Sequence, residues 1–280
     1  MRISVVIPSY NRLPTLIRAL DSVITQTSAA AEIIVVDDGS TDDTALEIPK
    51  RFPQVAFLKQ ENRGVSAARN TGIKQSSGDW IALLDSDDSW LPKKLQRVRE
   101  AQQLNPDTLL FHSEEIWIRN GVRVNAMNKH QKSGGWIFQQ CLPLCVISPS
   151  AAVIKRQLFD EVGLFDESLP ACEDYDLWLR ICQRFPVGYI DEPLINKYGG
   201  HEDQLSRQYW GMDRFRIRAL EKLLKDNRLK TGHRQAVLSM LEQKLKILLK
   251  GAIKHGNQSV IDEFQPLFDT VSEPGVASSC

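Results

Sequence analysis

Short apolar runs alternate with helical patterns along the first hundred residues, and this alternation constrains the fold more than any other feature of the chain. The runs around Ile34 and Ile81 are almost continuous, as in a sheet that is covered on both faces. This rhythm is typical of a Rossmann-like α/β fold with a doubly wound, mostly parallel sheet. Strands are expected over residues 3–7, 32–36, 55–58 and 80–84, and helices over 13–25, 41–51 and 65–75.

The pattern becomes less regular after Pro92. From Ser206 to Gly256 the chain predicts helix with few turn signals. We therefore expect an α/β domain over residues 1–205, whose halves meet near residue 105, and a helical extension over 206–280. Within the second half, helices are expected over 93–104 and 174–184, strands over 108–118 and 187–190, a loop over 120–133 and an apolar segment over 146–154.

The composition is that of an ordinary globular protein with a formal net charge of zero, which gives no electrostatic case for nucleic-acid binding. Cys141 and Cys145 lack a second Cys or His pair, so reduced thiols are favoured over disulfides or a zinc site. No run of about eighteen apolar residues predicts a membrane-spanning helix. The first apolar run is too short for a secretion signal, and we expect a cytoplasmic protein.

Polar side chains follow three of the expected strands at the point where each strand ends. Ligands of open α/β sheets bind beyond the carboxyl ends of the strands. The spacing alone therefore predicts that these side chains border one crevice. They are Ser9, Tyr10 and Asn11 after the first strand, Asp37 and Asp38 after the second, and Asp85, Asp87 and Asp88 after the fourth.

Asp85, Asp87 and Asp88 place three carboxylates within a short stretch of chain, where they repel one another unless a cation is bound. Mg²⁺ and Mn²⁺ take oxygen ligands and commonly bridge carboxylates and a diphosphate. The alternative is an Asp-rich turn that caps the next helix. The cluster by itself favours neither interpretation.

Asp37 and Asp38 precede a Gly-Ser-Thr sequence, which indicates a turn and a helix cap. A carboxylate at such a strand end can accept hydrogen bonds from a nucleotide base or from ribose hydroxyls. Ser40 or Thr41 is expected to cap the following helix. The capping role is compatible with nucleotide binding by the two acids.

Arg69 lies in an expected helix whose small residues let it approach the sheet closely. A guanidinium in that place can brace Asp38 or a phosphate. The alternative is a surface arginine whose stem lies along the protein.

Acidic residues open the expected helix near Asp174, where they suit the positive end of the helix dipole. In a cleft, such a carboxylate can act as a general base. Asp176 fits a structural role in the first turn, and Trp178 is expected in the core. His201 follows a strand-like segment and could complete a metal shell, although a lone histidine is usually not a ligand.

Six segments of the chain together form a specific pattern, although no single segment is decisive. They lie at residues 4–12, 33–44, 61–73, 78–88, 163–180 and 201–206. In this order they closely resemble the inverting family-2 nucleotide-sugar glycosyltransferases, which have the glycosyltransferase A (GT-A) fold. The resemblance covers residues 2–206 or thereabouts.

The resemblance implies roles for the residues on the nucleotide side. The loop that begins at Pro8 and continues through Ser9 and Tyr10 lies against the nucleotide. Asp38, with Asp37 beside it, resembles the acid that reads the base. Arg69 resembles the basic residue near that acid and the diphosphate.

The same resemblance implies a metal site, with Mg²⁺ or Mn²⁺ as the cofactor. Asp85, Ser86 and Asp87 match the Asp-x-Asp motif of the family, in which Asp85 and Ser86 are expected to contact the nucleotide. Asp87 is the expected metal ligand and Asp88 the second candidate, because the chain carries an acid at both positions. His201 resembles the late histidine that often supports the metal and the diphosphate.

Asp174 resembles the second member of the family's acidic pair, which is the usual catalytic base. Residues 1–105 then form the nucleotide-sugar half of the domain, and residues 106–205 form the acceptor half. The chemistry implied is a direct displacement with inversion, in which Asp174 takes the proton of the acceptor hydroxyl.

The resemblance favours a UDP-sugar donor, with dTDP- and GDP-sugars as alternatives. A saccharide or lipid-linked saccharide of surface polysaccharide or glycolipid assembly is the acceptor by analogy alone. The chain lacks the Gln-x-x-Arg-Trp motif of processive synthases, which indicates single transfer. Two other functions are compatible with parts of this pattern, a nucleotidyltransferase and a catalytically silent nucleotide-sugar-binding scaffold. No Gly-rich loop followed by a basic residue lies near the first strand, which argues against a nucleotidyltransferase. The presence of Asp174 argues against a silent scaffold.

Basic residues concentrate over residues 205–256, and apolar residues recur at helical spacing over 235–255. Such a helix either packs on the domain or on a second subunit, or lies on an anionic membrane surface. Lysines at the surface would each contribute about 1 kcal/mol to membrane binding. The lysines in question are Lys244, Lys246, Lys250 and Lys254.

Overall fold

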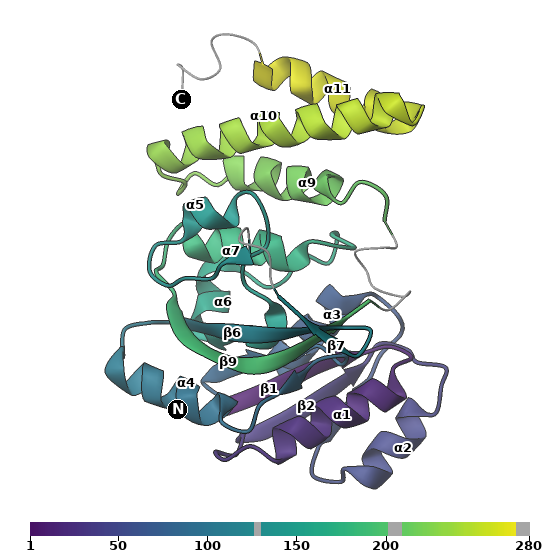
Figure 1. The fold of residues 1–280 in the computed structure, drawn as a ribbon, viewed down its shortest axis with the longest axis vertical. Helices are drawn as coiled ribbons and strands as arrows, with labels where there is room; N and C mark the ends of the chain where they lie inside the picture. Colours follow the sequence, from purple (N-terminus) through teal and green to yellow (C-terminus); the bar gives the residue numbers. More distant parts are fainter. Residues whose placement is uncertain (126–129, 201–208, 273–280) are drawn as a thin grey trace.

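The computed structural model describes residues 1–125, 130–200 and 209–272. Within these ranges the strands form one nine-stranded sheet in the order β3-β2-β1-β4-β8-β6-β9-β5, with β7 paired to β6. Figure 1 shows helices on both sides of the sheet and a stack of further helices above it. The strands are β1 (Ile3–Ser9), β2 (Glu32–Asp37), β3 (Ala56–Lys59), β4 (Trp80–Leu83), β5 (Ser89–Trp90), β6 (Leu110–Arg119), β7 (Val122–Val124), β8 (Val153–Lys155) and β9 (Gly188–Gly199).

The first four strands pair in parallel, as the sequence predicts. β1 lies between β2 and β4, and β3 pairs with the outer side of β2. The second half of the sheet is mixed, because β8 is antiparallel to both β4 and β6 whereas β9 runs parallel to β6. The predicted α/β architecture is therefore present, with parallel pairing among β1, β2, β3 and β4.

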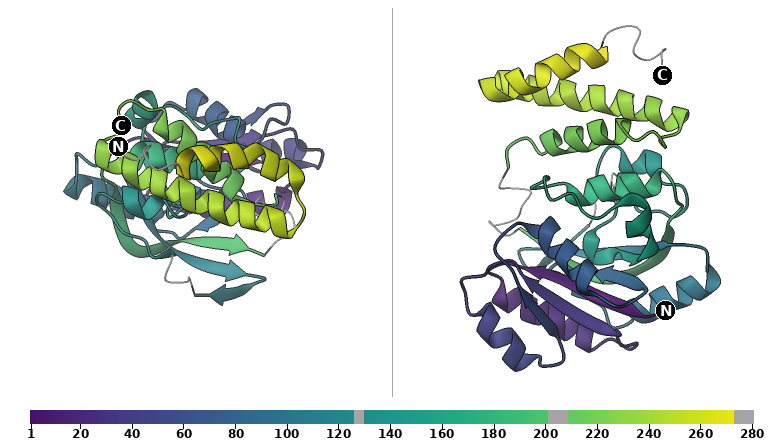
Figure 2. Two further views of the ribbon diagram at one scale, coloured as in Figure 1. Left: turned by 90° about the horizontal axis from the view of Figure 1, so that it is seen from above. Right: turned by 180° about the vertical axis from the view of Figure 1, so that it is seen from behind.

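Helices cover both faces of the sheet because successive residues of a strand point to opposite sides. Val5 and Ile7 of β1 enter one core with Leu20 and Leu95, whereas Val6 enters the other core with Trp178. Figure 2 shows the same layers from behind. The helices around the sheet are α1 (Leu13–Ile24), α2 (Thr44–Arg51), α3 (Val65–Gln75), α4 (Lys94–Leu104), α5 (Phe138–Cys141), α6 (Gln157–Val162) and α7 (Glu173–Cys182), with a 3₁₀ turn, η2 (Pro149–Ala151).

α3 packs against the sheet at close range, as its small residues predict. Ala67 and Ala68 are fully buried. A Cβ atom added at Gly72 would lie 2.4 Å from Cγ1 of Val6 in β1, so any side chain there would push the helix away. This close packing places the buried Arg69 beneath the carboxyl ends of the strands.

The carboxyl-terminal extension consists of α9 (Asp213–Leu224), α10 (Thr231–Lys254) and α11 (Gln258–Ser272). Figure 1 shows these helices stacked in turn above α7. Leu220, Leu245 and Phe264 belong to the same core as Trp178 of α7, so the extension packs on the domain. Lys244 is buried in this packing, and its Nζ lies 2.9 Å from the carbonyl of Pro143. None of the helices in the described ranges is long and apolar enough to cross a membrane.

Two strands of the second half differ from the sequence expectation. β9 extends over residues 188–199, whereas the apolar pattern predicts a strand only to Ile190. Asp191, Glu192 and Pro193 interrupt that pattern, and the pairing with β6 shifts register beside them. β7 lies within the expected loop over 120–133, because its three residues are too few to show a period.

The predicted cap of α2 is wrong. The helix begins at Thr44 rather than near Thr41, and the N–H of Thr44 donates to Oδ1 of Asp42 at 3.1 Å. Ser40 instead accepts a hydrogen bond from the N–H of Asn11 at 2.8 Å. The hydroxyl that resembles a helix cap therefore joins the loops after β1 and β2.

Candidate active site

The carboxyl ends of β1, β2 and β4 meet at one edge of the sheet, as predicted from the sequence. Ser9 pairs with Asp37 across β1 and β2, and the carbonyl of Ser9 accepts the N–H of Asp38 at 2.8 Å. Leu83, the last residue of β4, pairs with Val6 of β1, so Asp85 follows at the same edge. The polar clusters after the three strands are thus brought together.

Asp37 has an oxygen without a hydrogen-bonding partner among the described residues. The side chain is fully buried, and its Oδ1 accepts the N–H of Ser40 at 3.1 Å, whereas Oδ2 accepts nothing. The hydroxyl of Ser9 is also buried without a partner. A buried polar atom without a partner costs free energy, so both atoms suit a ligand that supplies hydrogen bonds. Tyr10, beside Ser9, is 46% exposed at the surface of this region.

Asp38 organises the loop that precedes α3. Its Oδ1 accepts Nε2 of Gln60 at 2.7 Å and the N–H of Arg63 at 3.0 Å, and its Oδ2 accepts the N–H of Gly64 at 2.8 Å. Arg69 contacts Asp85 and Glu173 instead of Asp38, so of its two expected partners, Asp38 and a phosphate, only the phosphate remains a prediction. The bonds of Asp38 fix the backbone beside the unpaired oxygen of Asp37.

Asn11 is a site residue whose role sequence reasoning missed. It adopts a left-handed backbone with φ of 51°, a conformation that asparagine tolerates better than most residues. Its Oδ1 accepts the N–H of Thr41 at 2.8 Å, which ties the loop after β1 to the loop after β2. The left-handed turn also carries the chain from Tyr10 to Arg12.

Arg69 joins two acids that lie far apart in the sequence. Its guanidinium donates to Oδ1 of Asp85 and to Oε1 of Glu173, each at 2.6 Å. The arginine side chain is only 4% exposed, and its two carboxylate partners outweigh the effect of burial and raise its pKa. The surface alternative for Arg69 is therefore excluded. The guanidinium fastens the end of β4 to the start of α7.

Glu173 occupies the first turn of α7 beside the candidate base. Burial raises the pKa of its carboxyl to about 7, and the negative charge of Asp174 adds to this effect while Arg69 opposes it. A carboxyl with such a pKa changes charge near neutrality. The charge around Arg69 therefore depends on pH in the range where an enzyme of this kind would act.

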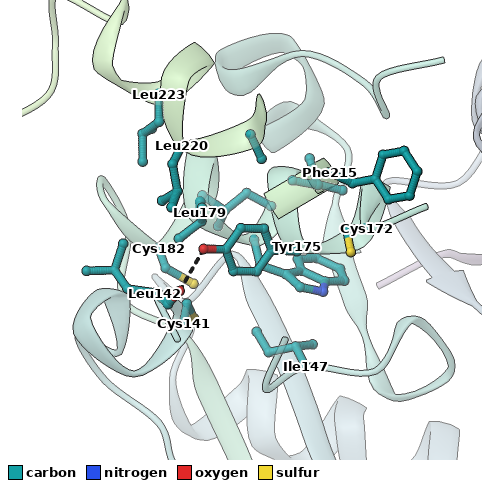
Figure 3. Packing of buried hydrophobic residues seen from close by; sticks show 14 of the residues in the cluster. Cys141, Leu142, Ile147, Cys172, Tyr175, Leu179, Cys182, Phe215, Leu220 and Leu223 are labelled. Atoms are coloured by element: carbon teal, nitrogen blue, oxygen red, sulfur yellow. Dashed lines mark hydrogen bonds between the residues drawn. The ribbon is translucent and has the colours of Figure 1, made fainter. Parts of the chain in front are cut away.

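Asp174 lies at the start of α7 with both oxygens oriented by hydrogen bonds. Oδ1 accepts its neighbour's N–H, that of Tyr175, at 2.7 Å, and Oδ2 accepts the thiol of Cys145 at 3.1 Å. The next residue anchors the helix, since the hydroxyl of Tyr175 donates to the carbonyl of Leu142 at 2.7 Å (Figure 3). Asp174 is thus a partly exposed carboxylate on a fixed helix terminus.

Asp87 and Asp88 differ in their surroundings although they are adjacent. The side chain of Asp87 is 21% exposed and forms an ion pair with Arg12 at 2.8 Å. Asp88 is 3% exposed, and its two oxygens accept the hydroxyl of Ser150 and the N–H of Tyr198, the latter at 3.0 Å. Burial, followed by the charges of Asp87 and Asp85, raises the pKa of Asp88 well above its usual range. Ser86, between Asp85 and Asp87, is buried.

A divalent metal fits the oxygen donors of Asp85 and Asp87. The Asp85 side chain is 28% exposed, and the exposed edges of both acids lie in the same turn. Hard cations such as Mg²⁺ and Mn²⁺ are held in this way by one or two carboxylates together with phosphate oxygens. Within residues 1–125, 130–200 and 209–272, no cluster of three or more candidate metal-binding side chains occurs. His201, the third predicted ligand, lies outside the described residues.

Arg18 and Lys197 are further charged residues that the sequence patterns did not single out. Arg18 of α1 donates to the backbone carbonyl of Asp87 and stacks on the ring of Tyr198, 3.7 Å from its centroid. Lys197 of β9 donates to the hydroxyl of Ser148 at 2.7 Å. Arg18 lies in the helix expected over 13–25 and Lys197 lies beyond the strand expected over 187–190, and neither is part of an acidic motif, so the patterns did not mark them as site residues.

The fold defines a class, that of the GT-A fold. The solved structure of the S. aureus protein TarS, residues 1–349 in complex with UDP-GlcNAc, is similar over 97% of this chain and 79% of that chain. Its TM-score is 0.73 and its sequence identity is 19%. A likeness at this identity establishes the fold.

The family assignment rests on the sequence itself. Residues 4–163 match the family described as glycosyl transferase family 2, and the chain belongs to that family. A Rickettsia bellii protein called an uncharacterized glycosyltransferase is 33% identical over 69% of this chain. The matched region makes up 28% of the length of that protein. The E. coli protein WfgD, a UDP-Glc:α-D-GlcNAc-diphosphoundecaprenol β-1,3-glucosyltransferase, is 33% identical over 73% of this chain and 79% of its own length.

Proposed function

We propose that this glycosyltransferase moves a sugar from a UDP-sugar to a hydroxyl of a lipid-linked saccharide, with inversion and with the help of a divalent metal. The observation that carries the proposal is the bridge from Asp85 through Arg69 to Glu173, which sets the metal-side acids and Asp174 around one centre. The resemblance to WfgD supports the substrate classes. It also favours glycosyl transfer over the nucleotidyltransferase alternative.

The nucleotide would lie across the carboxyl ends of β1 and β2. Oδ2 of Asp37, which has no partner among the described residues, would accept a hydrogen bond from the nucleotide there. The hydroxyl of Ser9, which also has no partner among those residues, would form a hydrogen bond with the nucleotide as well. Asp38 acts indirectly in this proposal, because its carboxylate holds the loop over 60–64. Tyr10 is exposed beside them and offers a ring for the base.

Asp85 and Asp87 would hold the metal, whose contribution is to neutralise the diphosphate as it leaves the sugar. Arg69 adds a fixed positive charge beside Asp85. Asp88 is assigned a structural role instead, since both of its oxygens accept hydrogen bonds from within the protein. This proposal resolves the choice between the adjacent acids in favour of Asp87.

Asp174 would accept the proton of the acceptor hydroxyl while that oxygen attacks the anomeric carbon and the bond to the diphosphate breaks. A single in-line step inverts the anomeric configuration. No bond between the sugar and the protein forms.

The test is the release of UDP from UDP-glucose and from UDP-N-acetylglucosamine, with and without α-D-GlcNAc-diphosphate on a short lipid. Transfer to the lipid-linked saccharide that requires Mg²⁺ or Mn²⁺ supports the proposal. Binding of the UDP-sugars without turnover under any of these conditions would instead indicate the silent nucleotide-sugar-binding scaffold.

A lipid-linked acceptor would draw the protein to a membrane surface. The outward face of α10 carries Lys246, Lys250 and Lys254 together with Ile247, which is 57% exposed, and Ile253, which is 64% exposed. Cations beside exposed apolar side chains suit the headgroup region of anionic lipids. We include this face in the proposed function as a peripheral membrane contact.

A further inference from the structure

A pocket of about 100 Å³ opens beside the candidate base and has no role in the site described above. Cys145, one of its lining residues, donates its thiol to Oδ2 of Asp174 at 3.1 Å. A group bound in the pocket would therefore lie next to the carboxylate that must meet the acceptor hydroxyl. The pocket is lined by Glu115, Trp117, His130, Lys132, Cys145, Val146, Ser148 and Lys197.

Glu115 is the fixed centre of this pocket. Its side chain is 1% exposed, and its oxygens lie 2.7 Å from Nζ of Lys132, 2.7 Å from Nε1 of Trp117 and 3.1 Å from Oγ of Ser148. Lys132 and the neighbouring Lys197 lower the pKa of Glu115 to about 2 against the effect of burial. A buried carboxylate with this many partners holds the surrounding side chains in one geometry.

Trp117 is an aromatic residue that lines the pocket beside Glu115. The bond from its Nε1 to Glu115 sets the plane of the indole, and the side chain remains partly exposed. Nζ of Lys197 lies over the ring, 5.6 Å from its centroid, so a hydrogen-bond donor stands close to the aromatic surface. An apolar flat surface flanked by a few fixed polar groups suits a pyranose ring, which has C–H groups on its faces and hydroxyls around its rim.

Lys197 connects the pocket with the rest of the site. Its side chain is 39% exposed and donates one of the three N–H groups of its ammonium to Ser148 at 2.7 Å. The next residue, Tyr198, donates its N–H to Asp88. A second hollow shares Trp117 and Lys197 with the first and continues past Arg119, so the pocket is open on the side away from Cys145.

The origin of the lining residues indicates which sugar the pocket takes. All of them lie between residues 115 and 197, in the half of the domain that follows residue 105. The groups on the nucleotide side, Asp37, Arg69 and Asp85, all come from the first half. Because Asp174 stands between the two sets, the pocket lies on the acceptor side of the base.

We infer that this pocket is the subsite for the acceptor sugar, with Trp117 as the surface on which the ring packs and Lys197 and Ser148 as its hydroxyl partners. The inference rests on the proposed function and adds to it the residues that select the acceptor. Glu115 and Lys132 are positioning residues, since their contacts are with Trp117, Ser148 and each other. Cys145 closes the end of the pocket at Asp174.

The experiment measures donor and acceptor separately in Trp117→Ala and Lys197→Met. Saturation-transfer NMR with α-D-GlcNAc-diphosphate on a short lipid measures acceptor binding. Calorimetry with UDP-glucose and with UDP-N-acetylglucosamine measures donor binding. Trp117→Phe keeps a flat ring and serves as the conservative variant. Trp136→Ala is the matched control, because Trp136 is 61% exposed and does not line the pocket.

We expect Trp117→Ala and Lys197→Met to weaken acceptor binding at least tenfold, while UDP-sugar affinity stays within error of the parent. Trp117→Phe should retain most of the acceptor signal. Loss of UDP-sugar affinity with the acceptor signal intact would assign the pocket to the transferred sugar and overturn the inference. An absent acceptor signal in the parent protein, or one that survives both substitutions, would also overturn it. Failure of the proposed function is distinct, since it appears as an absence of UDP release by the parent protein.

Discussion

Arg69 and Glu173 are 104 positions apart in the chain, and their side chains lie 2.6 Å apart in the interior. The contact joins α3, which packs on the parallel strands, to α7, which carries Asp174. It also orients the arginine toward Asp85 at the end of β4. The two halves of the domain are thereby locked together at the place where the proposed chemistry occurs.

Removal of this arginine should destabilise the fold. Arg69→Met leaves Glu173 buried without its partner, and breaking a buried ion pair in this way costs about 3–5 kcal/mol. The double variant Arg69→Met with Glu173→Gln should recover part of that loss, because no uncompensated charge remains at Glu173. Urea unfolding of the parent and both variants measures the difference. Equal stability of the parent and Arg69→Met would show that the pair contributes nothing to folding.

The ionisation of Glu173 should make stability depend on pH. Its pKa is raised from an ordinary value of 4.5 to about 7, so the folded state binds this proton more tightly than the unfolded state. The resulting stabilisation is fully present below pH 4.5 and is lost as pH rises through 7. A shift of this size corresponds to at most about 3 kcal/mol. Glu173→Gln lacks the effect, so its stability relative to the parent should increase between pH 5 and pH 8, as measured by urea unfolding at each pH.

Much of this arrangement follows from local sequence, and the rest depends on contacts that no local pattern encodes. The strand ends at Ser9, Asp37 and Asp85 could be predicted, because apolar runs fix where the parallel strands stop. The partner of Arg69 could not, since Glu173 is 104 positions away in the chain and the contact depends on how α7 packs. Lys197 was missed as well, because Asp191 and Glu192 break the apolar pattern of the strand that carries it.

Local sequence also does not indicate whether Asp87 or Asp88 is the metal ligand. Their sequence neighbours are equivalent, whereas their burial is set by Ser150 and Tyr198, which lie 62 and 110 positions from Asp88. The roles that the family resemblance implies for Asp87, Asp174 and His201 remain predictions. The following substitutions test the first two of these roles.

Asp87→Ala should abolish metal-dependent turnover and leave the fold intact, because the side chain is partly exposed and lies in a turn. Asp88→Asn should retain metal activation but lower the melting temperature, since its amide cannot accept both hydrogen bonds that the buried carboxylate accepts. UDP release is measured against Mn²⁺ and Mg²⁺ concentration for each variant. Full activity of Asp87→Ala in a chelator would remove Asp87 from the metal site.

Asp174→Asn should reduce transfer by roughly a hundredfold or more, the usual contribution of a general base, because the amide cannot accept the acceptor's proton. Donor affinity should stay close to that of the parent, since Asp174 contacts Cys145 and Tyr175 rather than the nucleotide-side residues. Asp160→Asn is the matched control, as Asp160 is an exposed acid on α6. Turnover and calorimetric donor binding are compared. Intact turnover with weakened donor binding would place the base elsewhere.

The last prediction concerns the membrane contact of α10. Its apolar stripe packs inside the chain, with Leu241, Leu245 and Leu248 buried, so deletion of the helix would expose the core and would not be a clean test. Lys244 is buried as well and contributes no surface charge.

Charge reversal of the exposed lysines tests the membrane contact without disturbing that core. We expect the parent protein to float with vesicles that contain anionic lipid at low salt and to be released at high salt. The triple variant Lys246→Glu, Lys250→Glu, Lys254→Glu should lose about 1 kcal/mol of binding or more for each lysine replaced. Reversal of Lys222, Arg218 and Arg228, exposed cations outside α10, is the matched control and should leave flotation unchanged. A parent protein that stays unbound at low salt, or a triple variant that floats as well as the parent, would leave α10 with its packing role alone.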